Sequence, residues 1–339
     1  MRSQQDPVQK QRNGRGSRDE VVDWGPQTLL DKGILQMYRL SVQSARAFVV
    51  LIGIWILFEQ LSPFEFAPIT DPIIFGYVVL SVLPAFFLAA YVWYTDITGG
   101  GPLWLLVVTF LLGICFAAFA AVINGRFGSA LLLALADEGV GQSVAMAILF
   151  FVVVGPAEEL VKLAAVRFQA WRTVHFNAVI SGAVYGAAAG LGFATIENTF
   201  YITQVLDGAS GLTETLREGG SIASARALAA PGHVIWSAIA GYYLGLARFN
   251  KRYRGAIVFK GLGIAVFAHA FYNVLVTNLP VILADSLGTS PVGLFFTFAI
   301  VYNGLFFAYL LYKLSAYRDA HQSAYGGTGP RSELTEFDP

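Results

Sequence analysis

About eight runs of mostly apolar residues dominate this chain, and each approaches the roughly 20 residues that a helix needs to cross a bilayer. In the hydrocarbon core every backbone N–H and C=O must be paired within the chain, so such runs predict helices. We therefore expect an all-α fold, a polytopic membrane helical bundle with about eight transmembrane helices. The predicted spans are 47–61, 73–94, 102–123, 143–166, 177–204, 227–248, 256–278 and 292–314.

The composition supports a membrane protein and excludes several other classes. Charged residues make up 13% of the 339 residues, against about 25% in an ordinary soluble domain. The net charge of zero offers no basic field for nucleic acid, so the expected partners are the lipid bilayer and whatever lies in it. The single cysteine, Cys115, lies in an apolar run, which excludes a disulfide framework and a cysteine-built metal site.

The polar ends of the chain set the expected organisation and orientation. Residues 1–40 and 317–339 are predicted to be disordered cytoplasmic tails on either side of a membrane bundle at 41–316. Most of the 22 Lys and Arg fall in the tails and in alternate loops, and basic loops stay in the cytoplasm. We expect a multi-pass protein of the cell membrane with both termini cytoplasmic. The apolar segment 129–136 is too short to span and is predicted to be interfacial or re-entrant.

Ionisable residues are concentrated in the spans between 143 and 278, although each costs roughly 2.5–3.5 kcal/mol near the bilayer centre. The fourth span contains Glu158, Glu159 and Lys162 just after Pro156, and proline is expected to kink the helix there. Lys162 is within reach of either glutamate on a helix. A Glu–Lys pair that merely tolerates burial explains one glutamate but leaves the second without a role.

Glu197 in the fifth span has no basic residue within a helical turn, so its counter-charge, proton or metal must come from another segment. It follows a stripe of small residues at four-residue spacing, which favours close approach by another helix. That stripe consists of Gly182, Gly186, Gly190 and Ala194.

Two histidines complete the set of polar groups in the spans. His233 lies in the sixth span, and His269 lies in the seventh with Asn273 on the same helical face. One membrane histidine is often only a hydrogen bonder between helices. Two histidines on separate spans, together with three glutamates, favour a functional site.

Such groups support two kinds of hydrolytic chemistry. Two imidazoles and a carboxylate form a ligand set of catalytic zinc, with a fourth position open for water. Without metal, a glutamate can take a proton from water and return it to a leaving amine, while the histidines and Asn273 hold the oxyanion. An ion- or proton-coupled membrane transporter would also use buried carboxylates in broken helices, and it is the alternative function.

Four sequence motifs, each on its own predicted span, resemble those of the PrsW family of intramembrane proteases. They are EELVK at 158–162, FATIEN at 193–198, HVIWSAIAG at 233–241 and HAFYN at 269–273. They correspond in order to the family patterns EExxK, FxxxEN, HxxxxxxxG and HxxxN, over about 120 residues. The family is distantly similar to the CAAX-type membrane proteases.

The resemblance implies an intramembrane endopeptidase that cuts a membrane-anchored protein substrate, such as an anti-sigma factor, with a catalytic core at 142–278. Glu158 and Glu159 would be catalytic, one of them as the base that activates water. Glu197, His233 and His269 would complete the site as Zn²⁺ ligands or by stabilising the transition state, and Asn273 would orient a neighbour. Lys162 and Asn198 would pair structurally with these groups.

The depth of the site poses a geometric problem. At 1.5 Å per residue, Glu158 lies far below the start of a span at 143, whereas His233 and Glu197 lie near the ends of theirs. We expect the fourth helix to start later, near 148, to run past Arg167 and to kink at Pro156.

Overall fold

The computed structural model describes residues 28–65, 67–99, 101–288 and 290–326, and every regular element in these ranges is helical. The chain divides into two compact units, Met1–Ile52 and Gly53–Pro339. Within these described ranges, seven helices are long and apolar enough to cross a membrane. The prediction of an all-α, polytopic membrane bundle is thus confirmed.

The first unit contains the beginning of α2 (Leu29–Leu61). A cap starts this helix: the Thr28 amide and hydroxyl donate to Asp31 Oδ2, and the Asp31 amide donates to Thr28 Oγ1. Reciprocal bonds of this kind satisfy amides that a helix start leaves unpaired. Residues 29–40, which were predicted to belong to the disordered tail 1–40, are therefore helical. Residues 1–27 of that predicted tail lie outside the described residues.

Residues 317–326, the first part of the predicted disordered tail 317–339, are helical as well. Helix α12 (Pro291–Gly326) continues past 317 because alanines such as Ala320 and Ala324 alternate there with polar residues that tolerate a helix. Residues 327–339 lie outside the described residues.

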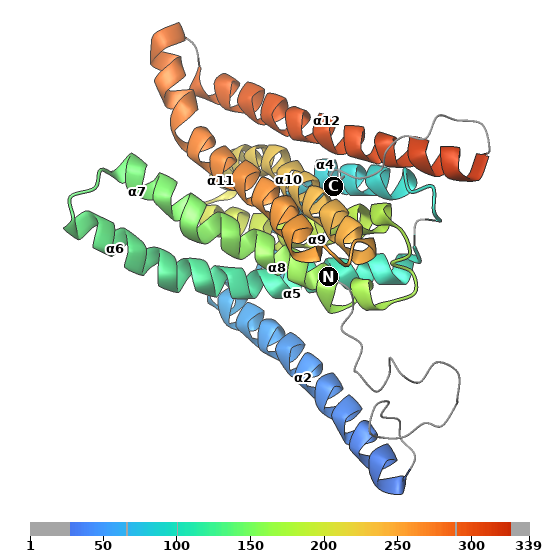
Figure 1. Ribbon diagram of the computed structural model, residues 1–339. Coiled ribbons are helices and arrows are strands. Elements are labelled where there is room, and N and C mark those ends of the chain that lie inside the picture. Colours follow the sequence, from blue (N-terminus) through green and yellow to red (C-terminus); the bar gives the residue numbers. More distant parts are fainter. Residues whose placement is uncertain (1–27, 66, 100, 289, 327–339) are drawn as a thin grey trace. The chain divides into compact units, whose positions relative to one another are not determined.

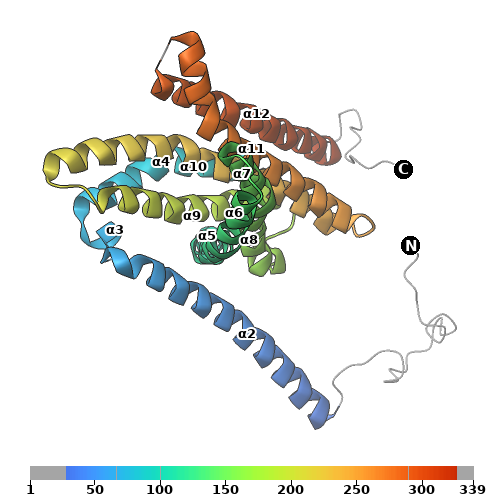
Figure 2. The ribbon, with the colours of Figure 1, turned by 90° about the vertical axis from the view of Figure 1, so that its left-hand side faces the viewer.

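The second unit is built around two long helices, α9 (Val179–Leu206) and α10 (Leu212–Phe249), which lie side by side (Figure 1, Figure 2). Helices α4, α5, α8 and α11 pack around this pair. The remaining elements of the unit are short α3 (Ala67–Thr70), α4 (Pro72–Tyr94), α5 (Leu103–Ile123), α6 (Ser129–Asp137), α7 (Gln142–Leu149), α8 (Gly155–Phe168) and α11 (Arg254–Leu287), with 3-10 turns η1 (Ser62–Phe64) and η4 (Ala170–Arg172).

Helix α10 is not one of the seven helices that are long and apolar enough to cross a membrane, although it contains the predicted span 227–248. It is rich in Gly, Ala and Ser and carries Arg226 and His233. Most of its second half is buried against neighbouring helices. The polar side chains in this half of α10 therefore face the interior of the bundle and not lipid.

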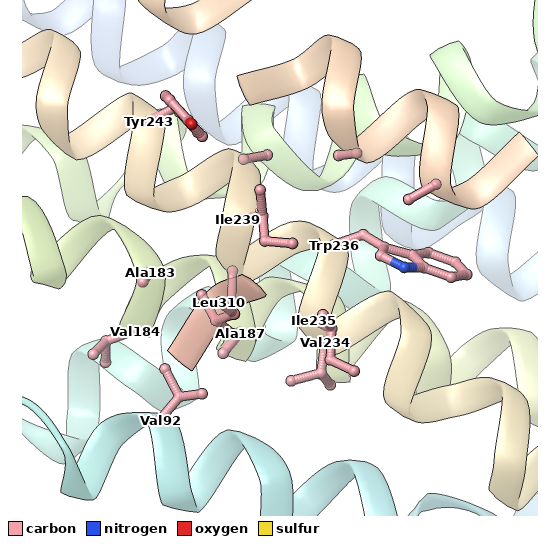
Figure 3. Close-up of a cluster of buried hydrophobic side chains, with 14 of the residues drawn as sticks. Val92, Ala183, Val184, Ala187, Val234, Ile235, Trp236, Ile239, Tyr243 and Leu310 are labelled. Atoms are coloured by element: carbon pink, nitrogen blue, oxygen red, sulfur yellow. The ribbon is translucent and has the colours of Figure 1, made fainter. Parts of the chain in front are cut away.

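Close contact between α9 and α10 depends on glycine, as the predicted stripe of small residues indicates. A Cβ atom added at Gly186 would lie 2.2 Å from the Ser237 carbonyl oxygen, and one added at Gly182 would lie 2.0 Å from the Gly241 carbonyl oxygen. Apolar side chains from both helices, such as Ala183, Ile235 and Ile239, fill the core beside this contact (Figure 3).

We expect Gly186→Ala to destabilise the protein by about 1–3 kcal/mol, the usual cost of overpacking, because the neighbouring backbone cannot move aside. The midpoint of unfolding in a titration with sodium dodecyl sulfate measures the effect. Gly263→Ala on α11 is the matched control, because no atom lies within 4 Å of its added Cβ. Equal midpoints for both variants would contradict the close-packing argument.

Two π-helical turns interrupt the helices that lead to the polar residues. Turn η2 (Asn124–Gly128) joins α5 to α6, and turn η3 (Phe150–Val154) joins α7 to α8. In η3 the Gly155 amide bonds to the carbonyl of Phe150, five residues back. Pro156, in the first turn of α8, has no amide hydrogen to continue the regular pattern.

These turns correct two predictions from the sequence. Segment 129–136 is α6, a continuation of α5 through η2, and not a separate re-entrant piece. The fourth helix starts at Gln142, not near 148, and reaches Phe168, one residue past Arg167. The candidate span Gln142–Arg172 has 31 residues, more than the roughly 20 that a bilayer needs, so its start does not fix the depth of Glu158.

Candidate active site

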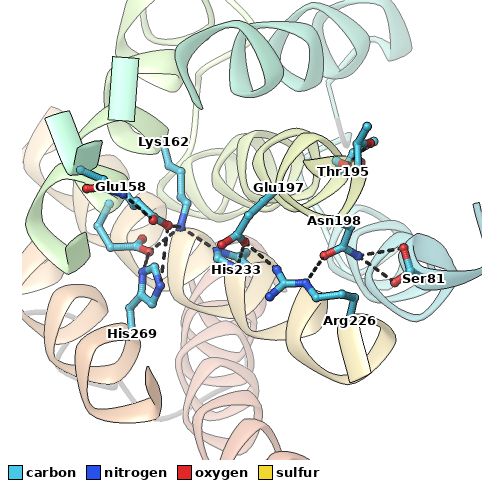
Figure 4. A network of polar contacts seen from close by, with 12 residues as sticks. Ser81, Glu158, Lys162, Thr195, Glu197, Asn198, Arg226, His233 and His269 are labelled. Atoms are coloured by element: carbon cyan, nitrogen blue, oxygen red, sulfur yellow. Dashed lines mark hydrogen bonds and ion pairs between the residues drawn. The ribbon is translucent and has the colours of Figure 1, made fainter. Parts of the chain in front are cut away.

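Four helices bring the predicted polar residues together in the second unit (Figure 4). Helix α8 provides Glu158 and Glu159, α9 provides Glu197, α10 provides His233, and α11 provides His269. All are buried except Glu197, whose side chain is 21% exposed. Residues that are 111 positions apart in the sequence thus lie within direct contact of one another.

Glu159 organises the most buried part of this cluster. Its Oε1 lies 2.7 Å from Lys162 Nζ and 2.9 Å from His269 Nδ1. A carboxylate only accepts hydrogen bonds, so His269 donates through Nδ1 and its Nε2 carries the lone pair. Glu159 therefore fixes both the orientation and the tautomer of His269.

His233 is held in the opposite tautomer. Its Nδ1 lies 2.8 Å from Lys162 Nζ, and its Nε2 lies 2.8 Å from Glu197 Oε2. An ammonium group only donates, so Nδ1 accepts from Lys162 and Nε2 donates its hydrogen to Glu197. Lys162, which is 1% exposed, thus links the Glu159–His269 pair to the Glu197–His233 pair.

Glu158 and Glu159 each have one buried oxygen that accepts no hydrogen bond from the described residues, and of these two glutamates only Glu158 lines a cavity. Glu158 Oε1 accepts from Asn124 Nδ2 at 3.0 Å. Its Oε2 accepts no hydrogen bond from the described residues. It lies 3.7 Å from His269 Nε2, too far for a direct hydrogen bond, and 3.8 Å from Lys162 Nζ.

Glu197 receives its counter-charge from another segment, as the sequence requires. Arg226 on α10 donates from Nη2 to Glu197 Oε2 at 2.7 Å and from Nε to Asn198 Oδ1 at 2.8 Å. Asn198 in turn donates to Ser81 on α4, at 3.0 Å to the hydroxyl. Figure 4 shows this chain of contacts from Glu197 through Arg226 and Asn198 to Ser81.

Sequence reasoning missed Arg226 and Asn124 as members of the site. Arg226 lies just outside the predicted sixth span, 227–248, whereas α10 starts at Leu212. The signal was available: residues 226 and 233 are seven apart and share a helical face. Asn124 had no comparable signal, because it follows an apolar helix and belongs to none of the four motifs.

Two cavities, of about 460 and 400 Å³, meet at the cluster. Both are lined by Asn124, Glu158, Glu197 and Tyr201. Asn273 lines the second cavity, together with both histidines, and no described residue pairs with its side-chain amide. Glu158 lines both cavities, whereas Glu159 lines neither.

One group of residues has the geometry of a metal site. Glu158, His233 and His269 each offer a ligand atom, and these atoms all lie within 4.8 Å of one another. The predicted set had Glu197 in place of Glu158, but Glu197 Oε2 is already engaged by Arg226 and His233. A carboxylate with two imidazoles fits zinc. Glu158 Oε2 and His269 Nε2 accept no hydrogen bond from the described residues, whereas His233 would have to give up its contact with Lys162 or with Glu197 to bind a metal.

Carboxylates and imidazoles that converge from four helices of a membrane bundle on a cavity are typical of a hydrolytic membrane enzyme. The family model described as PrsW family intramembrane metalloprotease matches residues 101–305. The chain belongs to this family, and it is an intramembrane protease and a multi-pass membrane protein.

Individual relatives agree with this assignment. A protein named Protease PrsW from Halalkalibacterium halodurans is 27% identical over 202 residues, which are 59% of this chain and 83% of the relative. The proteins of the same name from Geobacillus kaustophilus and Bacillus subtilis are 28% and 26% identical. The matched lengths are 59% and 60% of this chain, and 79% and 84% of those relatives. No solved structure matches the chain.

Proposed function

We propose that this protease hydrolyses a peptide bond of a membrane-anchored protein with a water molecule activated between Glu158 Oε2 and His269 Nε2. The supporting observation is that these two buried acceptors lie 3.7 Å apart at the meeting point of two cavities. A water molecule held there can donate to one acceptor and present its oxygen to a carbonyl carbon.

In this mechanism Glu158 takes the proton of the water as its oxygen bonds to the carbonyl carbon. The same proton passes to the leaving amine when the C–N bond breaks, so Glu158 acts as base and then as acid. Glu159 is a positioning residue, because it touches His269 and Lys162 and not the cavity. Glu197 in the same way positions His233.

The oxyanion that forms on the carbonyl needs hydrogen-bond donors aimed at it. Asn273 supplies one, since its side-chain amide lines the cavity beside His269. From the sequence, Asn273 is predicted to orient a neighbouring group. We propose a donor role instead, because the side-chain amide of Asn273 has no partner among the described residues.

Zn²⁺ is the metal that this donor set suits, and Glu158, His233 and His269 would hold it. When bound, zinc at such a site acidifies water and polarises a carbonyl. Glu158 Oε2 accepts no hydrogen bond from the described residues, which is consistent with a cation at this place. The relatives carry no support for the transport alternative.

The substrate proposed is a single-span protein of the anti-sigma-factor kind. Because family members act within the membrane, its scissile bond must reach the cluster from lipid, through one of the two cavities. The distribution of Lys and Arg supports both termini being in the cytoplasm, and the proposed catalytic core is 142–278.

Removal of metal tests the zinc proposal. We expect the protein, reconstituted in liposomes with a single-span reporter, to cut the reporter and to lose this activity after treatment with a chelator. Addition of Zn²⁺ to the chelated protein should restore cleavage, with the metal content measured on the same samples. Full activity at no measurable metal content would overturn the zinc proposal and leave the metal-free reaction of Glu158.

A further inference from the structure

Four arginines gather where α8 and α10 end and α11 begins. Arg167 is in the last turn of α8, Arg172 ends η4, Arg248 is in the last turn of α10, and Arg254 starts α11. We call these four residues the arginine cluster. They come from four helical elements and lie far along the helices from the catalytic residues.

A single buried aromatic ring organises the arginine cluster. Trp171 is 9% exposed, and the guanidinium carbons of Arg167, Arg248 and Arg254 lie 4.4, 5.1 and 6.0 Å from the centre of its ring. Arg248 also donates to the carbonyl oxygen of Trp171. Arg172 follows Trp171 directly in the chain. The ring holds the guanidinium groups in place through cation–π contacts.

The positive charge of the arginine cluster is not compensated. Arg172, Arg248 and Arg254 lie close enough to Arg167 for their charges to repel it. Within the described part of the chain, no carboxylate forms an ion pair with any of the four. An anion placed among them would remove the repulsion and gain charge-assisted hydrogen bonds.

Ordinary basic loops of membrane proteins do not have this arrangement. Lys251 and Arg252 lie in the loop between α10 and α11, and Arg252 stacks only on the adjacent Tyr253. Three members of the arginine cluster instead lie over the buried ring of Trp171. All four are arginine, whose planar fork matches a phosphate with two parallel bonds.

The position favours a lipid as the source of the anion. The cluster lies at the ends of membrane helices, on the side where most Lys and Arg are found, and this is the side of the anionic cytoplasmic leaflet. We propose that the arginine cluster binds the phosphate-bearing headgroup of an anionic lipid. A bound headgroup would tie together the ends of α8, α10 and α11, the helices that carry Glu158, His233 and His269.

Titration of the full chain in detergent micelles with phosphatidylglycerol tests this proposal, with bound lipid counted by native mass spectrometry. We expect Arg172→Gln with Arg254→Gln to weaken binding by about fivefold for each charge removed. Lys251→Gln with Arg252→Gln removes the same charge from the neighbouring loop and should leave the affinity unchanged. Equal weakening by both pairs would show a diffuse basic surface and overturn the proposal.

Further titrations identify the species that binds to the arginine cluster. Phosphatidylcholine and inorganic phosphate, titrated alone, should bind much more weakly, and saturation by phosphate to the same extent would indicate a free-anion site instead. Glu333→Gln, Glu336→Gln and Asp338→Asn together neutralise an acidic segment outside the described residues. A gain in lipid affinity from this change would make that segment the occupant.

Substitution by lysine covers the case in which the glutamine variants do not fold. Arg172→Lys with Arg254→Lys keeps the charge and removes the fork, so phosphatidylglycerol should bind more weakly than to the parent chain. Unchanged affinity in this variant would also overturn the proposal.

Discussion

Glu158→Gln is expected to reduce cleavage of a membrane-anchored reporter by about 10²–10⁴-fold, the usual contribution of a general acid–base residue. The introduced amide oxygen can still accept from Asn124, whose Nδ2 lies 3.0 Å from Glu158 Oε1, so the fold is retained. The amide cannot take a proton from water at the position of Oε2. The loss should therefore fall in kcat, with KM little changed.

The measurement is the initial rate of cleavage in liposomes, with the unfolding midpoint recorded for each variant. Glu138→Gln is the matched control, because Glu138 is exposed in the turn between α6 and α7. A rate for Glu158→Gln close to that of the parent and of this control would exclude Glu158 as the group that activates water.

Lys162→Met is expected to destabilise the protein by about 3–5 kcal/mol, the cost of breaking a buried ion pair. Glu159 is 0% exposed, and Lys162 Nζ lies 2.7 Å from its Oε1. Without the ammonium group, Glu159 stays buried with only His269 as a partner. His233 Nδ1 also loses the donor that fixes its tautomer.

The double variant Lys162→Met with Glu159→Gln should recover part of this stability, because no unpaired carboxylate then remains buried. Unfolding in a titration with sodium dodecyl sulfate compares the two variants, and Lys251→Met, at an exposed loop position, serves as control. A single variant as stable as the parent would mean that Glu159 is not ionised in the folded protein.

Much of the fold follows from hydropathy alone. Spans such as α4 and α5 are recognisable because their side chains meet lipid on one side and helices on the other. Helix α10 is the instructive case: its start at Leu212 is hidden because its polar side chains face the protein interior. A hydropathy pattern shows whether side chains of a helix face lipid or water only where no other helix covers those side chains.

The composition of the candidate site could be predicted, but its internal pairing could not. The four motifs identify Glu158, Glu197, His233 and His269, and the structure brings them together. Which carboxylate faces which imidazole depends on the rotation of four helices about their axes. Arg226 changes the outcome as well, because it engages Glu197 Oε2, whereas Glu158 Oε2 accepts no hydrogen bond from the described residues.

The π-helical turn η3 determines the direction in which Glu158 points. Such a turn commonly arises where one extra residue is accommodated within an α-helix. Each residue advances an α-helix by about 100°. Deletion of one residue between Phe150 and Val154 would therefore rotate the whole of α8 relative to α7, and the glutamate pair would leave the histidines. The length of a segment that contains no charged residue thus decides whether the acids and imidazoles can meet at all.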